Sequence, residues 1–305
     1  DGPQSVMLLG HMDTVPGEIP VQREGDRLYG RGAVDAKGPL AAFIVAGASV
    51  DVPQGSKLVV AGAVEEEAAT SRGARHLIGQ AGRPGQAQWP APTAVIVGEP
   101  SGWDRVTVGY KGRLLVDYEL TQEGAHSSRG DETACERAVG YWSWVKGFSI
   151  AHSAQEHRQF DKLDCSLRRI NSEHDGLRDR VSMEVAMRLP LGFDVALFQQ
   201  AATRFAGAAA VCFRGYEPAF RADKNTALVR ALLRAIRNQG GEPRFSVKMG
   251  TSDMNVVGPA WKCPILAYGP GDSELDHTPR EHILLSEYQR SIEVLREVLG
   301  VLLGE

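Results

Sequence analysis

The feature that most constrains the fold is the alternation of short apolar runs with longer segments of helical periodicity. This order is typical of an α/β core, in which strands and helices follow one another along the chain. The runs of strand length are Val6–Leu9, Leu58–Val64, Thr93–Val97 and Pro264–Ala267. The segments with helical spacing are Pro39–Ser49, Arg72–Gly79, Thr226–Asn238 and Ser286–Leu303. We therefore expect an α/β domain.

The middle of the chain has a different pattern. It contains more strands, two of them alternating like a hairpin, and only two helices, which indicates an α+β module inserted into the core. The expected strands are Val106–Tyr110, Leu114–Leu120, Asp164–Ile170, Val181–Leu189 and Ala209–Phe213, and the expected helices are Glu132–Lys146 and Val195–Phe205. We predict a core domain of residues 1–105 and 215–305, with residues 106–214 as the inserted domain.

Composition narrows the classes of function. The net charge of −4 gives no basic footprint, so we expect no nucleic acid partner. No apolar run reaches membrane-spanning length, and no leader pattern precedes Val6, so we expect neither a membrane segment nor a signal peptide in these residues. The four cysteines form no CxxC pair, which favours reduced thiols in a cytoplasm and argues against a sulfur-bound structural zinc.

Five short motifs place histidines and acids just after predicted core strands. His11 and Asp13 follow the first strand, and a carboxylate close to a histidine can orient the imidazole of a metal ligand. Asp35 lies in the glycine-rich turn Gly30–Gly38, which opens a helix. Taken singly, a structural His–Asp pair explains the first motif at least as well, and a helix-capping aspartate is the better explanation of Asp35.

The other three motifs are also acidic or contain histidine. They are Glu65-Glu66-Glu67, Gly98-Glu99-Pro100 and Asp276-His277-Thr278-Pro279. Adjacent glutamates repel one another unless protons or cations intervene, although a solvated acidic loop is the simpler explanation of one such run. Together the five motifs lie where α/β sheets place their sites, and their N/O donors without cysteine suit two zinc ions bridged by one carboxylate.

With these motifs, essentially the whole chain resembles the family of di-zinc aminoacylases, acetylornithine deacetylases, succinyl-diaminopimelate desuccinylases and related carboxypeptidases. The resemblance implies a zinc-peptidase-like core, a mixed sheet flanked by helices, with an inserted lid and dimerisation domain. It implies that His11, Asp35 and Glu99 hold one zinc and that Asp35, Glu66 and His277 hold the other. Cobalt and manganese suit the same donors.

The resemblance also implies the catalytic residues. Glu65 would be the general base and Asp13 would orient His11, with Val64 taken as the first position of the family's Asp-Glu-Glu motif. The other register, with Glu66 as base and Glu67 as ligand, stays open. Both registers imply a metal-dependent hydrolase that cuts an amide (C–N) bond.

The inserted module resembles the family's lid. Gly109-Tyr110-Lys111-Gly112 and Gly124-Ala125-His126-Ser127-Ser128 match its opening, so His126 would stabilise the oxyanion in the neighbouring subunit of a homodimer. Arg188 would bind a substrate carboxylate. The turn containing Gly250 and Thr251 resembles a substrate-side loop.

The details are most similar to a subgroup that releases lysine or ornithine from a small acidic amino-group carrier protein in amino-acid biosynthesis. There the amino acid is attached through its α-amine to the γ-carboxyl of the carrier's terminal glutamate. The residues concerned are Val34–Leu40, Gly62–Glu67, Thr70–Arg75 and Val97–Gly102. A deacylase of small N-acyl amino acids and a catalytically silent metal-binding scaffold are the alternatives.

The inserted module contains a group of basic residues that could interact with an acidic carrier protein. A basic lid would steer an acidic carrier protein, although a solvated charged face explains the same residues. The cations are Arg158, Lys162, Arg168, Arg169, Arg178, Arg180 and Arg188.

Overall fold

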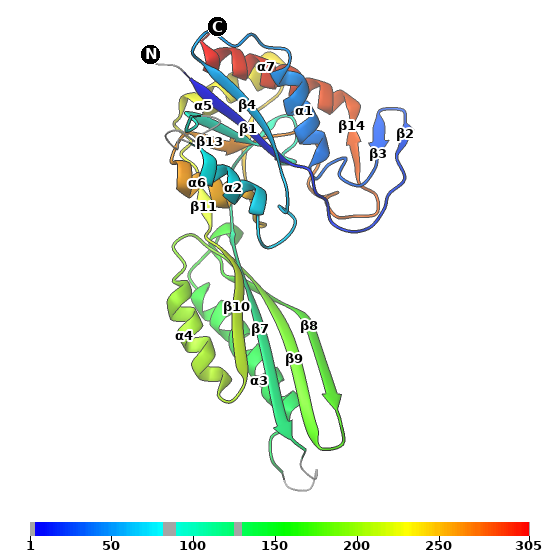
Figure 1. The fold of residues 1–305 in the computed structure, drawn as a ribbon, viewed down its shortest axis with the longest axis vertical. Helices are drawn as coiled ribbons and strands as arrows, with labels where there is room; N and C mark the ends of the chain where they lie inside the picture. The colour runs from blue at the N-terminus through cyan, green and yellow to red at the C-terminus, as the bar shows by residue number, and fades with distance from the viewer. Residues whose placement is uncertain (1–3, 82–89, 125–129, 305) are drawn as a thin grey trace. The chain divides into compact units, whose positions relative to one another are not determined.

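The computed structural model describes residues 4–81, 90–124 and 130–304. The chain divides into two compact units, drawn in Figure 1. The first consists of Asp1–Tyr110, Phe220–Lys248 and Ser252–Glu305, and the second of Lys111–Ala219 with Met249–Thr251. Each unit is described by itself below.

A mixed seven-stranded sheet forms the centre of the first unit. Its strand order is β11-β6-β13-β5-β1-β4, and β12 pairs with β6. The four neighbouring strands β13, β5, β1 and β4 are mutually parallel, so their carboxyl ends meet at one edge of the sheet. The bounds are β1 Ser5–His11, β4 Lys57–Ala63, β5 Ala94–Val97, β6 Arg105–Tyr110, β11 Phe220–Arg221, β12 Arg244–Lys248 and β13 Ile265–Ala267.

Helices cover both faces of this sheet because its central strands are apolar on both sides. In β1, Val6 and Leu8 belong to one buried cluster and Met7 and Leu9 to the other. The first cluster includes residues of α1 (Lys37–Gly47), α5 (Ala227–Asn238) and α7 (Leu285–Leu303), and the second those of α2 (Arg72–Gln80) and α6 (Asp253–Trp261). A small antiparallel sheet of β2 (Gln22–Glu24), β3 (Arg27–Tyr29) and β14 (His282–Leu284) completes the unit.

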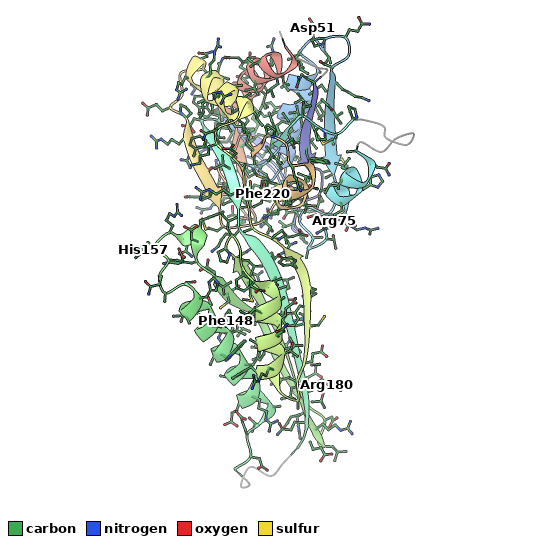
Figure 2. All side chains as sticks on the ribbon, turned by 90° about the vertical axis from the view of Figure 1, so that its left-hand side faces the viewer. Asp51, Arg75, Phe148, His157, Arg180 and Phe220 are labelled. Carbon is green, nitrogen blue, oxygen red and sulfur yellow. The ribbon has the colours of Figure 1, made fainter. Side chains whose placement is uncertain are left out.

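The second unit has its own core. Its antiparallel sheet has the order β10-β7-β9-β8 and packs against two helices (Figure 1). Phe148 of α3, labelled in Figure 2, meets Phe198 of α4 edge-on with ring centroids 5.2 Å apart. The bounds are β7 Gly112–Glu123, α3 Ala134–His152, the 3₁₀ turn Gln159–Asp161, β8 Asp164–His174, β9 Arg178–Leu189, α4 Val195–Ala206 and β10 Ala210–Glu217.

The structure confirms the predicted α/β core with a mixed sheet flanked by helices. The predicted hairpin of 106–110 with 114–120 is wrong. Strand β6 lies in the first unit's sheet beside β13 and β11, whereas β7 pairs with β9 and β10. Both strands alternate in the same way, and only their pairing partners distinguish the sheets. The units accordingly divide after Tyr110 and after Ala219, later than the predicted positions 105 and 214.

Among residues 4–81, 90–124 and 130–304, no helix combines the length and the apolar character needed to cross a bilayer.

Truncating Phe198 tests the core of the second unit. Phe198 is fully buried among Trp144, Phe148 and Phe213. Replacement by alanine should lower the free energy of unfolding by about 3–5 kcal/mol, because it leaves a cavity among rigid aromatic rings. Leu197→Ala is the matched control, since the neighbouring Leu197 is 60% exposed. Equal shifts of the urea midpoint in both variants would contradict this account.

Candidate metal centre

His11 is the last residue of β1 and is 1% exposed. Its Nδ1 lies 3.0 Å from the carbonyl oxygen of Asp13, which can only accept, so Nδ1 carries the proton and donates. Its Nε2 faces Asp35 Oδ1 at 3.2 Å. The hydrogen bond to Asp13 therefore leaves Nε2 as the nitrogen that can bind a metal.

The carboxylate of Asp35 lies between two imidazoles. Its Oδ1 faces His11, and its Oδ2 lies 3.1 Å from Nε2 of His277. A tight turn holds Asp35 there, in which Lys37 N donates to the carbonyl of Gly32. Gly32 has φ +84°, and a Cβ at this position would lie 2.7 Å from Cγ2 of Thr14. This turn thus requires glycine for both its backbone angle and its space.

Glu99 lies two residues beyond the end of β5 and is 8% exposed. It forms one group of potential ligands with His11 and Asp35, in which the ligand atoms lie within 4.8 Å of one another. Its Oε1 is buried and has no hydrogen-bond partner among the described residues. A buried carboxylate oxygen of this kind is costly unless a cation or a proton neutralises it.

The three adjacent glutamates point in different directions. Strand β4 ends at Ala63, and the chain turns at Glu65, whose φ is +60°. The side chain of Glu65 turns outward, where Thr70 Oγ1 donates to it at 2.7 Å and Arg72 pairs with it at 3.3 Å. The carboxylate of Asp13 accepts hydrogen bonds from the backbone N–H groups of Glu66 and Glu67, at 3.3 and 3.1 Å.

Glu67, rather than Glu66, lies beside His277. Its Oε1 is 3.2 Å from Nε2 of His277, and Asp35, Glu67 and His277 form a second group of potential ligands. The carboxylate of Glu66 lies 4.0 Å from Nε2 of His11. This geometry departs from the register in which Glu65 is the base and Glu66 the ligand, and it favours the other one. The reason is that β4 ends one residue before Val64, so the acidic motif begins at Glu65.

Asp13 also differs in detail from its predicted role. It orients His11 through its backbone carbonyl, while its side-chain Oδ1 stays 3.6 Å from the imidazole. Its carboxylate fixes the backbone of the glutamate turn instead. Asp13 therefore contacts both parts of the candidate centre.

Burial and close charges shift the pKa values of both histidines and of Asp35. Burial by itself lowers the pKa of His11, but the hydrogen bond to Asp35 and the charge of Glu99 outweigh it and raise the pKa to about 11. Hydrogen bonds to Asp35 and Glu67 raise the pKa of His277 to about 10. Hydrogen bonds from both imidazoles hold the pKa of Asp35 below its ordinary value, against the opposing effect of burial.

The pKa values of two other acids, Glu66 and Glu99, are raised. Burial raises the pKa of Glu66 to about 8, against the opposing charge of His11. Burial, together with the charges of Glu66 and Asp35, raises the pKa of Glu99 well above its ordinary value. Several carboxylates at one buried edge, one with an unpartnered oxygen, fit divalent cations, because N/O donors bind such ions and their charge removes the repulsion.

The predicted substrate residues lie in the second unit. Nη1 of Arg188 and Nη1 of Arg113 lie 3.4 and 3.3 Å from the hydroxyl oxygen of Thr251, to which both can donate. Gly250 precedes Thr251 in the same unit. His126 lies outside the described residues. Two guanidinium groups thus lie beside one hydroxyl, so this part of the second unit is positively charged.

Glu281 is the site residue that the motifs missed. It is 1% exposed, and its carboxylate accepts hydrogen bonds from the backbone N–H groups of Val34 and Asp35. The only sequence signal is an acid four residues after His277, and nothing in the sequence shows that this acid is buried.

The sequence is similar to those of known proteins. The profile of Peptidase family M20/M25/M40 matches residues 7–300. A LysW-lysine hydrolase of Deinococcus radiodurans is 43% identical, over 99% of this chain and 83% of that protein. A LysW-lysine/LysW-ornithine hydrolase of Sulfurisphaera tokodaii is 31% identical, over 94% of this chain and 78% of that protein. These matches extend over nearly the whole chain.

A solved structure shows the same fold. A metallo-carboxypeptidase of the M20 family from Sulfolobus solfataricus superposes with a TM-score of 0.75. It is 18% identical, and the match covers 99% of this chain and 86% of that one. At this identity the likeness concerns the fold alone.

Loading the centre with a cation should release protons. At pH 7 both His11 and His277 hold a proton in the metal-free protein, because each pKa lies above 7, and each must lose it to bind a metal. Zn²⁺ binding should therefore release about two protons or more. Calorimetric titration in two buffers of different ionisation enthalpy measures this number, and His277→Ala should lower it by about one. Equal binding heats in both buffers would contradict the expectation.

Proposed function

Because this chain belongs to peptidase family M20/M25/M40, whose members are metal-dependent, we propose that it is a metal-dependent hydrolase of an amide bond. Its proposed substrate is lysine or ornithine joined to the γ-carboxyl of the terminal glutamate of an amino-group carrier protein. The related proteins from Deinococcus radiodurans and Sulfurisphaera tokodaii are named as hydrolases of LysW-lysine and, for the second, also of LysW-ornithine. The observation that carries the proposal is the pair of ligand groups that share Asp35 in a chain so similar to these relatives.

The proposed centre holds two cations. His11, Asp35 and Glu99 would bind one, and Asp35, Glu67 and His277 the other, with Asp35 as the bridge. We propose Zn²⁺ as the native ion, although Co²⁺ and Mn²⁺ accept the same N/O donors. When bound, the ions polarise a carbonyl and make water more acidic.

Glu66 is the proposed general base. Its carboxylate is close to the ligands, 4.0 Å from Nε2 of His11, without belonging to either ligand group. From this position it would take a proton from the attacking water and return it to the departing amine, as a general base and acid does. Asp13 contributes by fixing the backbone N–H groups of Glu66 and Glu67.

Charges in the second unit support a carrier protein as the partner. Arg188 and Arg113 suit a substrate carboxylate, which a γ-linked conjugate has on each side of its amide bond. Four further arginines of the two neighbouring strands β8 and β9 are exposed, and these can attract an acidic protein. They are Arg168, Arg169, Arg178 and Arg180, the last labelled in Figure 2.

Three further parts of the proposal rest on the family resemblance and on the cysteines. His126 would stabilise the oxyanion of a neighbouring subunit, and this role requires a homodimer. The second unit would serve as the lid and dimerisation domain. A cytoplasmic location suits a biosynthetic enzyme whose four cysteines are all free.

Paired substitutions decide between the two registers of the glutamate motif. Glu66→Gln should lower kcat by about 100- to 10,000-fold, because it removes the proton acceptor, while the bound metal is retained. Glu65→Gln is the matched control. It should stay within about twofold of the wild type, since this side chain faces Thr70 and Arg72 at the surface. Steady-state kinetics with metal analysis measures both, and the reverse result would restore Glu65 as the base.

The substrate is tested with a peptide that ends in γ-glutamyl-lysine. The enzyme should release lysine from this peptide and leave the α-linked isomer and free acetylornithine nearly untouched, because the γ-linkage sets the spacing of the two carboxylates around the amide. Chromatography of the released amino acid measures all three reactions. A preference for acetylornithine would indicate a small-molecule deacylase, and inactivity on every substrate with metal bound would indicate a scaffold.

A further inference from the structure

Glu281 is a buried acid that makes hydrogen bonds with both oxygens of its carboxylate. Oε1 accepts from the backbone N–H of Val34 at 3.0 Å and from that of Asp35 at 3.2 Å. Oε2 forms an ion pair with Nη1 of Arg31 at 2.7 Å. All three partners lie in the turn that presents Asp35.

The main chain strengthens the same connection. The backbone N–H of Gly30 donates to the carbonyl of Glu281 at 3.4 Å. The next residue, His282, pairs with Tyr29 in the ladder of β14 and β3. Glu281 thus ties the turn that carries Asp35 to the segment that carries His277, four residues earlier in the chain.

Arg31 is itself held in place. Its Nε donates to the carbonyl of Gly17 at 3.0 Å, and its side chain is 15% exposed. A buried ion pair contributes little net stability, because removing two charges from water offsets most of their attraction. The two backbone N–H groups at Oε1 instead point to a geometric role for the pair, since they fix the position of Asp35.

We propose that Glu281, with Arg31, is a positioning residue that holds Asp35 where it can bridge two cations, an inference that rests on the metal centre proposed above. Asp35 faces His11 with one oxygen and His277 with the other. A small shift of its backbone would move both oxygens at once. The hydrogen bonds of the Glu281 carboxylate go to Arg31, Val34 and Asp35, so its effect on the cations passes through Asp35.

Glu281→Gln is the main test. The amide side chain keeps the volume but has one acceptor oxygen, so its NH₂ group must face either Arg31 or the two backbone N–H groups. Affinity for at least one of two Zn²⁺ equivalents should fall by about 10- to 100-fold. Titration of the metal-free protein in competition with a chromophoric chelator measures this without substrate.

Arg31→Met is the second variant, and Glu287→Gln is the matched control. Arg31→Met removes the ion pair but keeps the two N–H contacts of Oε1, so its loss of affinity should be smaller, about three- to tenfold. Glu287 is a half-buried acid of α7 whose Oε1 accepts from the backbone N–H of Trp103 at 3.4 Å, and it belongs to neither ligand group. Glu287→Gln should bind Zn²⁺ as the wild type does.

A kinetic measurement separates positioning from substrate contact. At saturating Zn²⁺ the KM of Glu281→Gln for the γ-glutamyl-lysine peptide should equal that of the wild type, because Glu281 is buried and its carboxylate is hydrogen-bonded to the Asp35 turn. Circular dichroism and the thermal midpoint establish that each variant is folded. If Glu281→Gln does not fold, the affinity of Arg31→Met decides the question.

Two results would overturn the role of Glu281 while leaving the metal centre intact. One is wild-type Zn²⁺ affinity in Arg31→Met, or in a folded Glu281→Gln variant. The other is an equal loss in Glu287→Gln, which would mark a general weakening of the domain. A wild-type protein that binds no Zn²⁺ would instead overturn the metal centre and the proposed function with it.

Discussion

The shared carboxylate of Asp35, with an imidazole on each side, is the interaction on which the rest of the site depends. His11 and His277 approach its two oxygens at 3.2 and 3.1 Å. The sheet makes this meeting possible, because β13, β5, β1 and β4 run parallel and end at one edge. Segments distant in the chain therefore deliver their polar side chains to the same place.

That convergence has an electrostatic cost. Burial raises the pKa of Glu66 to about 8 and that of Glu99 well above its ordinary value, because a buried carboxylate without a cation is poorly solvated. The pKa values of His11 and His277 are raised as well, since each imidazole faces the carboxylate of Asp35. A bound cation would stabilise such a centre. Metal binding is then coupled both to the release of protons and to the stability of the surrounding fold.

The two units of the chain would have different roles in the proposed enzyme. It has a separate aromatic core around Phe198, so its sheet does not depend on the first unit for burial. Arg113 and Arg188, which lie beside the Thr251 hydroxyl, belong to this unit, whereas both ligand groups belong to the first. Selection of the substrate and cleavage of its bond would then be assigned to different units, which can vary independently.

The sequence alone determined the α/β core, since the continuous apolar run of β1 requires helices on both faces of the sheet, and it located the acids and histidines after the strands. It could not decide which glutamate faces His277. Three identical side chains in a row carry no distinguishing signal, and the end of β4 at Ala63 sets their directions. Strand β6 reads like its neighbour β7, and only tertiary pairing assigns the two to different sheets. Glu281 looks like any surface acid in the sequence, because burial is a property of the folded chain, and its contacts with Asp35 join residues 246 positions apart.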